Sequence, residues 1–396
     1  MNHFTFAILV PNLIRDFFMK YFWVALFFCF FGNAVNAQFE TKTNETEIYI
    51  LTCSPGADLY SVFGHTAIMV KTPTTDFVYN YGTFDFNTDN FYVKFARGQL
   101  PYKVAKEEFG YFQYGYIREQ RQIWAQRLNF TSKQKTTLID LLEVNVLPEN
   151  ALYKYDFFYD NCATRIRDII DEATGNTVDW GKANKANGST FRQMIDVYLP
   201  DMEWSDLGID IALGLPCDYY VQDGEQAFLP DSLMYLFDNA RLNGNSLMAD
   251  GFEVLPAEPI QVKKKFKDSS FKVICFISIV LLIVLFIYRR KRFSRILSAL
   301  ILLVNGLVGT LIFLLWFFTD HNATMDNLNI LWASPLNLIL PFLKFSRKIW
   351  LQIYSGITVA TLMVWSFLPQ DMHESLVPFV FVSLFSALIY IRRIDE

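Results

Sequence analysis

Histidine and cysteine are both scarce in this chain of 396 residues, which contains four histidines and five cysteines. The cysteines show none of the paired spacings typical of metal ligands, so we expect no metal centre and no cofactor. They are Cys29, Cys53, Cys162, Cys217 and Cys275. The formal net charge is -5, and no block of Lys and Arg is large enough to indicate nucleic acid as a partner.

Hydrophobic residues make up 52% of the sequence and aromatic residues 17%, and most of this excess lies after Phe271. Residues 263–396 are therefore predicted to form an all-α membrane domain with about five transmembrane helices. The predicted spans are Phe271–Tyr288, Ile296–Phe318, Ile330–Phe345, Trp350–Leu368 and Leu376–Ile391.

Two connections between these spans, Thr319–Asn329 and Pro369–Ser375, contain no Lys or Arg, whereas the alternate connections are basic. The positive-inside rule places the basic connections in the cytoplasm, and His321, His373 and the preceding domain outside it. The basic run Lys263–Lys267 is an exception, which we attribute to a signal peptide that fixes the first crossing.

The N-terminal region has the anatomy of a secretory signal peptide. Met19 and Lys20 precede an apolar run from Tyr21 to Phe31, and small and polar residues follow as far as Ala37. This arrangement predicts a signal peptide over residues 1–37, with an extension before Met19 and cleavage after Ala37. The alternative is an uncleaved anchor, but the apolar run is shorter than a membrane span requires.

Residues 38–262 are predicted to form an exported α+β domain. Glu47–Thr52 and His65–Lys71 have the composition of strands, and the second alternates as a half-buried strand does. Phe77–Phe84 is expected to return as an antiparallel partner. Thr131–Val146 is typical of an amphipathic helix with a Thr or Ser cap at its N-terminus.

The stretch Tyr155–Glu172 carries the strongest chemical signal. Apolar residues recur at helical spacing after Cys162, and Gly175 supplies a stop, so Cys162 is expected to open a helix. Asp160 and Asn161 are natural capping residues, and the sulfur should lie beside unpaired backbone N–H groups at the positive end of the helix dipole. Such surroundings lower the pKa of a thiol and provide an oxyanion hole. A buried structural cysteine is the alternative, against which the polar flanking residues argue.

A cysteine nucleophile needs a base, and His65 is the one histidine in residues 38–262. It begins a predicted strand beside Gly64, which permits close approach of the backbone. A lone histidine is more often structural, but the combination with Cys162 at a helix start favours a catalytic base. A third group should orient the imidazole, and the candidates are Asn80 on the neighbouring strand and Asp85 just beyond it. Strand register, which decides between them, does not follow from the sequence.

Four motifs occur in order along the exported region. They are Leu-Thr-Cys-Ser-Pro-Gly-Ala-Asp-Leu-Tyr-Ser-Val-Phe-Gly-His-Thr-Ala (51–67), Tyr-Asn-Tyr-Gly-Thr-Phe-Asp-Phe (79–86), Lys-Phe-Ala-Arg-Gly-Gln-Leu-Pro-Tyr (94–102) and Tyr-Asp-Phe-Phe-Tyr-Asp-Asn-Cys-Ala-Thr-Arg-Ile-Arg-Asp (155–168). From about Glu47 to Arg167 this combination resembles the Lnb N-terminal periplasmic domain family. The number of predicted spans and the loop at residues 321–332 are also similar to that family.

The resemblance implies a lipoprotein N-acyltransferase of the bacterial inner membrane, multi-pass, with its catalytic domain in the periplasm. The order of His before Cys is similar to the circularly permuted branch of the papain-like NlpC/P60 superfamily, so the implied fold is a permuted papain-like cysteine-enzyme domain followed by an all-α transmembrane bundle. On this resemblance His65 is the base and Cys162 the nucleophile. Cys162 would take an acyl chain from a membrane phospholipid as a thioester and pass it to the α-amine of a bacterial lipoprotein.

Three further residues are candidates for substrate binding. Arg97 could hold a lipid phosphate, and an exposed surface arginine is the alternative. Asn161 stands at the helix start beside the nucleophile, and His321 could shape a lipid entrance unless it is a solvated loop residue. Cys53 and Cys217 share an oxidising compartment and could form a disulfide.

Two other functions remain open at this point. A hydrolase of the same fold, cleaving peptidoglycan peptides, would use the same Cys and His. A non-enzymatic membrane sensor would carry a degenerate pair that does not react selectively with a thiol or acyl probe. Five spans are more than an anchor requires, which favours a lipid substrate.

Overall fold

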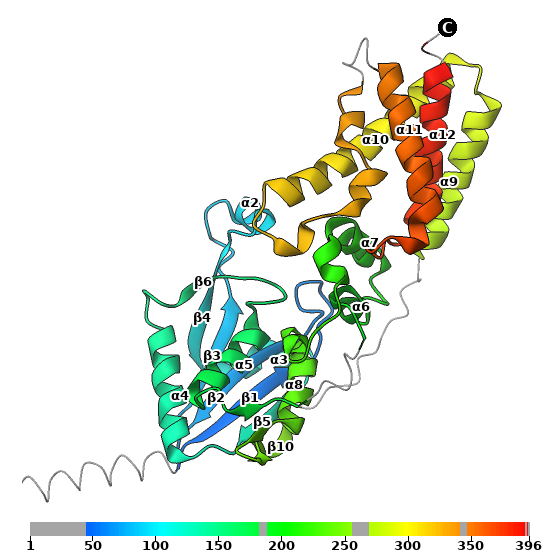
Figure 1. The fold of residues 1–396 in the computed structure, drawn as a ribbon. Coiled ribbons are helices and arrows are strands. Elements are labelled where there is room, and N and C mark those ends of the chain that lie inside the picture. The colour runs from blue at the N-terminus through cyan, green and yellow to red at the C-terminus, as the bar shows by residue number, and fades with distance from the viewer. Residues whose placement is uncertain (1–44, 182–187, 256–268, 341–346, 393, 395–396) are drawn as a thin grey trace, which may run out of the picture.

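The computed structural model describes residues 45–181, 188–255, 269–340, 347–392 and 394. Figure 1 shows an α/β domain followed by a helical region. The predicted signal peptide, Cys29 and the basic run Lys263–Lys267 lie outside the described residues.

A seven-stranded antiparallel sheet forms the centre of the first domain, in the order β10-β5-β1-β2-β3-β4-β6. The strands are β1 Glu47–Cys53, β2 His65–Lys71, β3 Asp76–Thr83, β4 Pro101–Glu108, β5 Ile123–Leu128, β6 Leu152–Lys154 and β10 Met248–Leu255. A three-stranded sheet joins β7 Val178–Asp179, β8 Arg241–Leu242 and β9 Asn245–Ser246. The three strands predicted from the sequence are β1, β2 and β3, each within one residue at either end.

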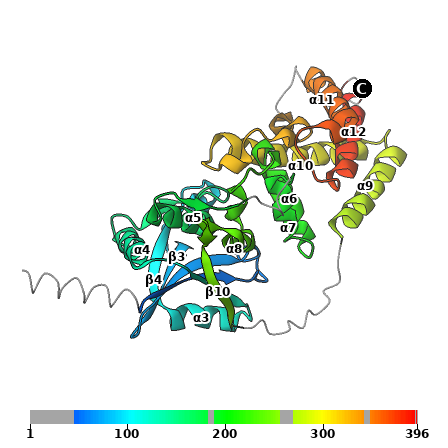
Figure 2. The same cartoon turned by 60° about the horizontal axis from the view of Figure 1, so that its bottom comes forward.

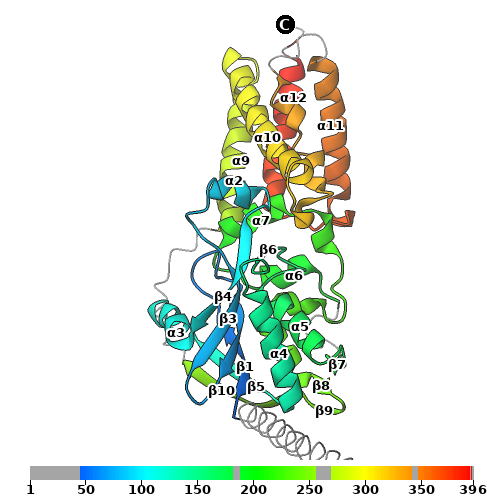
Figure 3. The same ribbon diagram turned by 90° about the vertical axis from the view of Figure 1, so that its left-hand side faces the viewer.

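Helices cover both faces of the large sheet (Figure 3). On one face pack α4 Ser132–Asn145, α5 Cys162–Ala173 and α8 Pro230–Asn239, and on the other packs α3 Phe109–Arg118. The expectation that β2 is half-buried was wrong, because α3 covers its second face and the five inner residues of β2 are all buried. The helix predicted at Thr131–Val146 is α4, which begins with a capping box between Thr131 and Gln134.

A linking region joins the sheet to the helical domain (Figure 2). It contains α6 Phe191–Asp196, α7 Glu203–Ala212 and the 3-10 turns η1 Leu215–Asp218 and η2 Glu225–Phe228. The short helix α2 Phe91–Ala96 precedes β4 and lies at the end of the domain nearest the helical bundle.

Four long helices are described in the second domain: α9 Ser270–Ile287, α10 Arg292–Phe317, α11 Arg347–Val364 and α12 Leu376–Arg392. Among the described residues, α9, α10 and α11 with its extension η7 Trp365–Phe367 are long and apolar enough to cross a bilayer. Helix α12 is apolar and shorter. These four correspond to four of the five predicted spans.

The remaining predicted span, Ile330–Phe345, is not a continuous helix where it is described. Its residues form the 3-10 turns η4 Leu328–Leu331 and η5 Pro335–Asn337 and lie against α10, with η3 Asn322–Thr324 just before them. Residues 341–346 lie outside the described residues.

Two features of α10 accommodate this irregular backbone. Asn305 donates to the carbonyl of Trp332 and accepts from the backbone N–H of Ser334, which satisfies groups that a helix would have paired internally. Gly306 and Gly309 allow the close approach, since a Cβ would lie 2.2 Å from Leu338 N at the first position and 2.2 Å from Ala333 O at the second. Hydropathy detects the apolar composition of this segment but not the side chain that replaces its helical hydrogen bonds.

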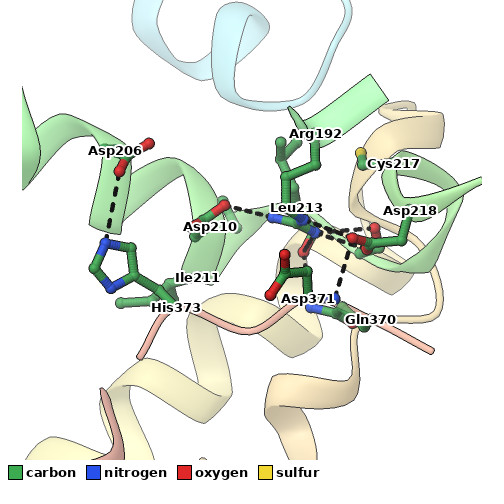
Figure 4. A network of polar contacts seen from close by, with 12 residues as sticks. Arg192, Asp206, Asp210, Ile211, Leu213, Cys217, Asp218, Gln370, Asp371 and His373 are labelled. Carbon is green, nitrogen blue, oxygen red and sulfur yellow. Dashed lines mark hydrogen bonds and ion pairs between the residues drawn. The ribbon is translucent and has the colours of Figure 1, made fainter. Parts of the chain in front are cut away.

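A network of polar contacts joins the two domains (Figure 4). Arg192 is buried and bonds Asp210, with Nη1 to Oδ1 at 2.6 Å, and Asp218, with Nε to Oδ1 at 2.9 Å. From the helical domain, Asp371 donates its backbone N–H to Asp218 Oδ1 at 3.1 Å. At Gly214, a Cβ would lie 1.7 Å from the carbonyl oxygen of Met325, so the two backbones meet there without room for a side chain.

Candidate active site

Cys162 lies at the first residue of α5, where β2 begins and β3 ends. Asn161 caps this helix, because its Oδ1 accepts from the backbone N–H groups of Ala163 at 2.8 Å and Thr164 at 3.0 Å. Thr164 Oγ1 accepts in return from the N–H of Asn161 at 2.8 Å, which completes a capping box. The helix ends before Gly175, whose φ of 69° is the left-handed conformation expected of a stop.

The amide of Asn161 is fully engaged in holding this helix start. Its Nδ2 donates to the carbonyls of Phe157 at 2.7 Å and Phe228 at 2.8 Å, while its Oδ1 takes the two N–H groups of the cap. An Asn side chain has two donors and one carbonyl oxygen, so no donor is left for a ligand. These four hydrogen bonds fix the backbone beside Cys162, and Asn161 also lines the cavity described below.

The Cys162 sulfur is surrounded by hydrogen-bond donors. The side chain is 8% exposed, bonds the His65 imidazole and accepts from the backbone N–H groups of Thr66 and Ala163. Gly82 lies beside Cys162 at an irregularity of the β3–β4 pairing, and its φ of 84° is a backbone conformation that favours glycine. Two strand ends and a helix end therefore converge on one thiol.

His65 and Asn80 are joined across adjacent strands. The register pairs Ile68 with Tyr79, so Asn80 lies diagonally from His65 on the same face, with His65 Nε2 and Asn80 Oδ1 2.6 Å apart. This contact leaves Nδ1 for the sulfur. Asn80 Nδ2 in turn donates to Glu107 Oε1 on β4 at 3.1 Å.

Asp85, the other candidate for orienting His65, has no described contact with it. It is exposed beyond the end of β3, where its Oδ1 accepts from the backbone N–H of Asn87 at 2.8 Å. The geometry therefore favours Asn80.

The pair favours charge separation. Burial alone would raise the pKa of the Cys162 thiol, but the positive charge and hydrogen bond of His65 together with the two backbone donors outweigh burial and lower that pKa below its usual value. Burial alone would lower the pKa of His65, but the Cys162 thiolate and the bond to Asn80 raise it. Both directions favour a thiolate beside an imidazolium, which is the reactive form of a cysteine nucleophile.

A cavity of ≈ 570 Å³ opens onto this pair. Its walls are mainly aromatic and aliphatic, which suits an apolar ligand. The aromatic and aliphatic side chains that line it include Phe63, Phe84, Leu100, Tyr102, Tyr155 and Phe157.

His321 is one of the lining residues, and it comes from the helical domain. Its Nε2 lies 3.1 Å from the carbonyl oxygen of Phe95, and its ring lies 3.2 Å from where a Gly98 Cβ would be. Beside it, the backbone N–H of Asp320 donates to the carbonyl of Arg97 at 2.8 Å. Arg97 itself is exposed and does not line the cavity.

Two residues beside the pair were not identified from the sequence. Glu107 is one of several polar residues on β4, and no sequence feature distinguishes it from its neighbours. Tyr155 belongs to the stretch that contains Cys162, but its position against the cavity depends on how that stretch folds back. Burial raises the pKa of Tyr155 well above its usual value, with the Cys162 charge acting in the same direction.

The other described cysteines are free. The disulfide considered between Cys53 and Cys217 is therefore absent from the described structure. Burial raises the pKa of Cys53 to about 12 and that of Cys217 to about 12, so both thiols should be inert at neutral pH.

Asp206, Asp210 and His373 form the one group among the described residues whose ligand atoms could surround a metal ion. These atoms lie within 4.8 Å of one another. Asp210 already bonds Arg192, and His373 Nε2 lies 3.6 Å from Asp206 Oδ2, so they also serve the contact between the domains (Figure 4). None of the three lines the cavity at Cys162.

Two family models match separate parts of this chain. The model described as the Lnb N-terminal periplasmic domain matches residues 34–196, and the model described as the Lnb transmembrane domain matches residues 263–395. The chain belongs to the Lnb family. No curated protein and no solved structure matches the chain significantly. The first Lnb model includes Cys162, His65, Asn80 and Glu107, and the second includes His321.

Proposed function

We propose that this Lnb-family protein is a lipoprotein N-acyltransferase with a cysteine nucleophile. The observation that carries the proposal is the Cys162–His65 pair at an apolar cavity whose wall includes His321 from the transmembrane domain. A soluble substrate would not need a cavity to which the transmembrane domain contributes a residue. A lipid donor resides in the bilayer, beside that domain. The substrates are a membrane phospholipid and a bacterial lipoprotein.

The first half-reaction forms a thioester. The Cys162 thiolate attacks the ester carbonyl carbon of a phospholipid, and the backbone N–H of Cys162 stabilises the oxyanion, since Asn161 Oδ1 already accepts from the N–H groups of Ala163 and Thr164. The leaving alkoxide takes the proton of the His65 imidazolium and departs as a lysophospholipid. The acyl chain remains on Cys162.

The second half-reaction transfers this acyl chain. The α-amine of the lipoprotein N-terminal cysteine attacks the thioester carbonyl, and the nitrogen gives up a proton to His65. The C–S bond breaks, so Cys162 returns as a thiolate beside the imidazolium and the product leaves as an amide. Asn80 holds the ring in both steps, and Glu107 holds Asn80.

We further propose that the exported domain is a permuted papain-like fold. Support comes from a histidine on a strand that precedes, in the chain, a cysteine at the start of a helix packed on the sheet. The location that fits both substrates is the bacterial inner membrane, with the catalytic domain in the periplasm. Basic residues support that orientation: Arg289 and Arg290 just after α9, Arg347 and Lys348 at the start of α11, and Arg392 at the end of α12.

Mass spectrometry of lipoprotein N-termini tests the proposal. Cells that contain the protein should carry an N-acyl group on the N-terminal cysteine, and cells that lack it or carry Cys162→Ala should have a free α-amine there. Release of peptidoglycan peptides with unchanged lipoprotein N-termini would instead indicate the hydrolase.

A further inference from the structure

Exposed aromatic side chains surround the short helix α2. The helix has no buried residue. Tyr92 is 82% exposed, and Phe86 in the preceding loop is 70% exposed. The group, which we name the α2 patch, consists of Phe86, Phe91, Tyr92, Val93 and Phe95. Contiguous exposed apolar surface of this kind marks a site of contact with a partner or a membrane.

The α2 patch lies at the end of a membrane-spanning helix. Phe95 and Arg97 bond to His321 and Asp320, the residues that closely follow α10. Figures 1 and 3 show α2 beside this end of α10. Because α10 is long and apolar enough to cross a bilayer, its end marks the headgroup level, where aromatic rings concentrate.

Charges of both signs accompany the patch, since Asp85 and Asp89 lie in the loop before α2 and two cations lie at its other end. Lys94 lies in the last turn of α2, and Arg97 follows the helix directly. Cationic side chains beside aromatic rings are typical of short segments that lie in the membrane interface. This composition favours a lipid surface over a protein partner as the occupant.

A row of rings leads from the α2 patch to the nucleophile. Phe86 contacts Phe84, with ring centroids 5.0 Å apart, and Phe84 contacts Tyr102 at 5.3 Å. Tyr102 stacks on Tyr155 at 4.3 Å, and Tyr155 lines the cavity with Cys162. The surface patch and the catalytic cavity therefore share one continuous apolar wall.

We propose that the α2 patch inserts among the headgroups of the bilayer, and that the row of rings guides one acyl chain of a phospholipid from the bilayer to Cys162. A chain that stays on apolar side chains avoids exposing its methylenes to water, each of which would add to the barrier. The guiding role rests on the proposed function, whereas insertion of the patch does not.

Photocrosslinking of the full-length protein in phospholipid nanodiscs tests both parts without turnover. The probe is a phosphatidylcholine with a diazirine in one acyl chain, and the protein carries Cys162→Ala. Adducts are expected within residues 84–102 and at Tyr153–Tyr155, in addition to α9–α12, and none at Tyr111 on α3, an equally exposed tyrosine at 75%. Adducts confined to α9–α12 would overturn the proposal.

The double variant Tyr92→Asp, Val93→Asp then tests causation, with Tyr111→Asp as its matched control. Tyr92, Val93 and Tyr111 are all exposed, so neither the double variant nor its control should disturb folding. The double variant should lose the adducts at residues 84–102 and keep those on α9–α12. In protein with Cys162 intact, it should lower the ratio of acylation by bilayer phospholipid to acylation by soluble p-nitrophenyl butyrate by about tenfold or more.

An unchanged ratio in the double variant overturns the guiding role. Failure of the proposed function gives a different result, since wild-type Cys162 would then form no thioester with bilayer phospholipid, whether or not it reacts with p-nitrophenyl butyrate, while the adduct map stayed as expected.

Discussion

His65 Nε2 lies 2.6 Å from Asn80 Oδ1, across two strands whose register places both residues on one face. This contact fixes which ring nitrogen faces Cys162, and Glu107 holds the other end of the Asn80 amide. The orientation of the His65 imidazole therefore depends on three adjacent strands.

Asn80→Ala should lower the rate of thioester formation by about tenfold to a hundredfold, since a poorly oriented base costs on the order of 10² in rate. The change should act on kcat and on the basic limb of the pH profile, because the Asn80 bond contributes to the raised pKa of His65. Asp85→Asn is the control and should leave the rate unchanged. Equal losses in both variants would contradict the assignment of Asn80.

Cys162 should remain alkylatable by iodoacetamide below the pH range of an ordinary thiol, whose pKa is ≈ 8.5. The lowered pKa of Cys162 keeps the thiolate populated as pH falls, and peptide mapping separates it from the other thiols. His65→Ala removes the stabilising charge and should move the midpoint of the alkylation pH profile upward, because burial is then opposed only by the two backbone N–H donors. A midpoint that does not move would show that His65 does not hold the thiolate.

Supplying phospholipid without an acceptor should leave an acyl group on Cys162. Intact-protein mass spectra should show the added fatty acyl mass, and hydroxylamine should remove it, since thioesters are labile to that nucleophile. Cys162→Ala should show no adduct. An acyl group found only on a Ser or Lys would rule out this mechanism.

Gly214→Ala should weaken the contact between the domains. The new Cβ would lie 1.7 Å from Met325 O, so the backbone at Met325 must shift relative to Gly214, and His321 in the cavity wall lies only four residues before it. We expect a loss of acyl transfer of about tenfold or more. Gly208→Ala on α7 is the matched control, because nothing lies within 4 Å of its Cβ. It should retain activity, and an equal loss there would show that the effect is not one of domain contact.

Asp196→Asn should stabilise the protein at high pH. Burial, with added repulsion from Asp210 and Asp206, raises the pKa of Asp196 to about 7 from 3.8. Unfolding between those two pH values therefore releases a proton, so this group lowers stability as pH rises through that window, with its full cost above pH 7.

The difference in Tm between Asp196→Asn and wild type should accordingly widen from pH 5 to pH 8. Each kcal/mol of destabilisation by ionised Asp196 that the substitution removes should raise the Tm by about 2–4 °C. Thermal unfolding followed by intrinsic fluorescence measures this difference. A constant difference across the pH range would contradict the raised pKa.

Local signals in the sequence were sufficient for the position of Cys162 at a helix start, for that helix and for the strands around it. Asn161 and Gly175 bound α5 through capping chemistry that involves neighbouring residues only, and the alternation at His65–Lys71 reports a strand directly. Four of the membrane helices follow from hydropathy in the same way, since each pairs its own backbone.

The tertiary structure alone decided the relationships between distant segments. Strand register places Asn80, and not Asp85, in contact with His65. A shift of one residue in that register would turn Asn80 to the opposite face of the sheet. Residues 328–340 do not form a continuous helix, and Asn305, on another segment, bonds the Trp332 carbonyl and the Ser334 N–H that a helix would have paired internally. His321 reaches the cavity only because the two domains pack together, and contacts across 226 positions of sequence leave no periodicity for the sequence to reveal.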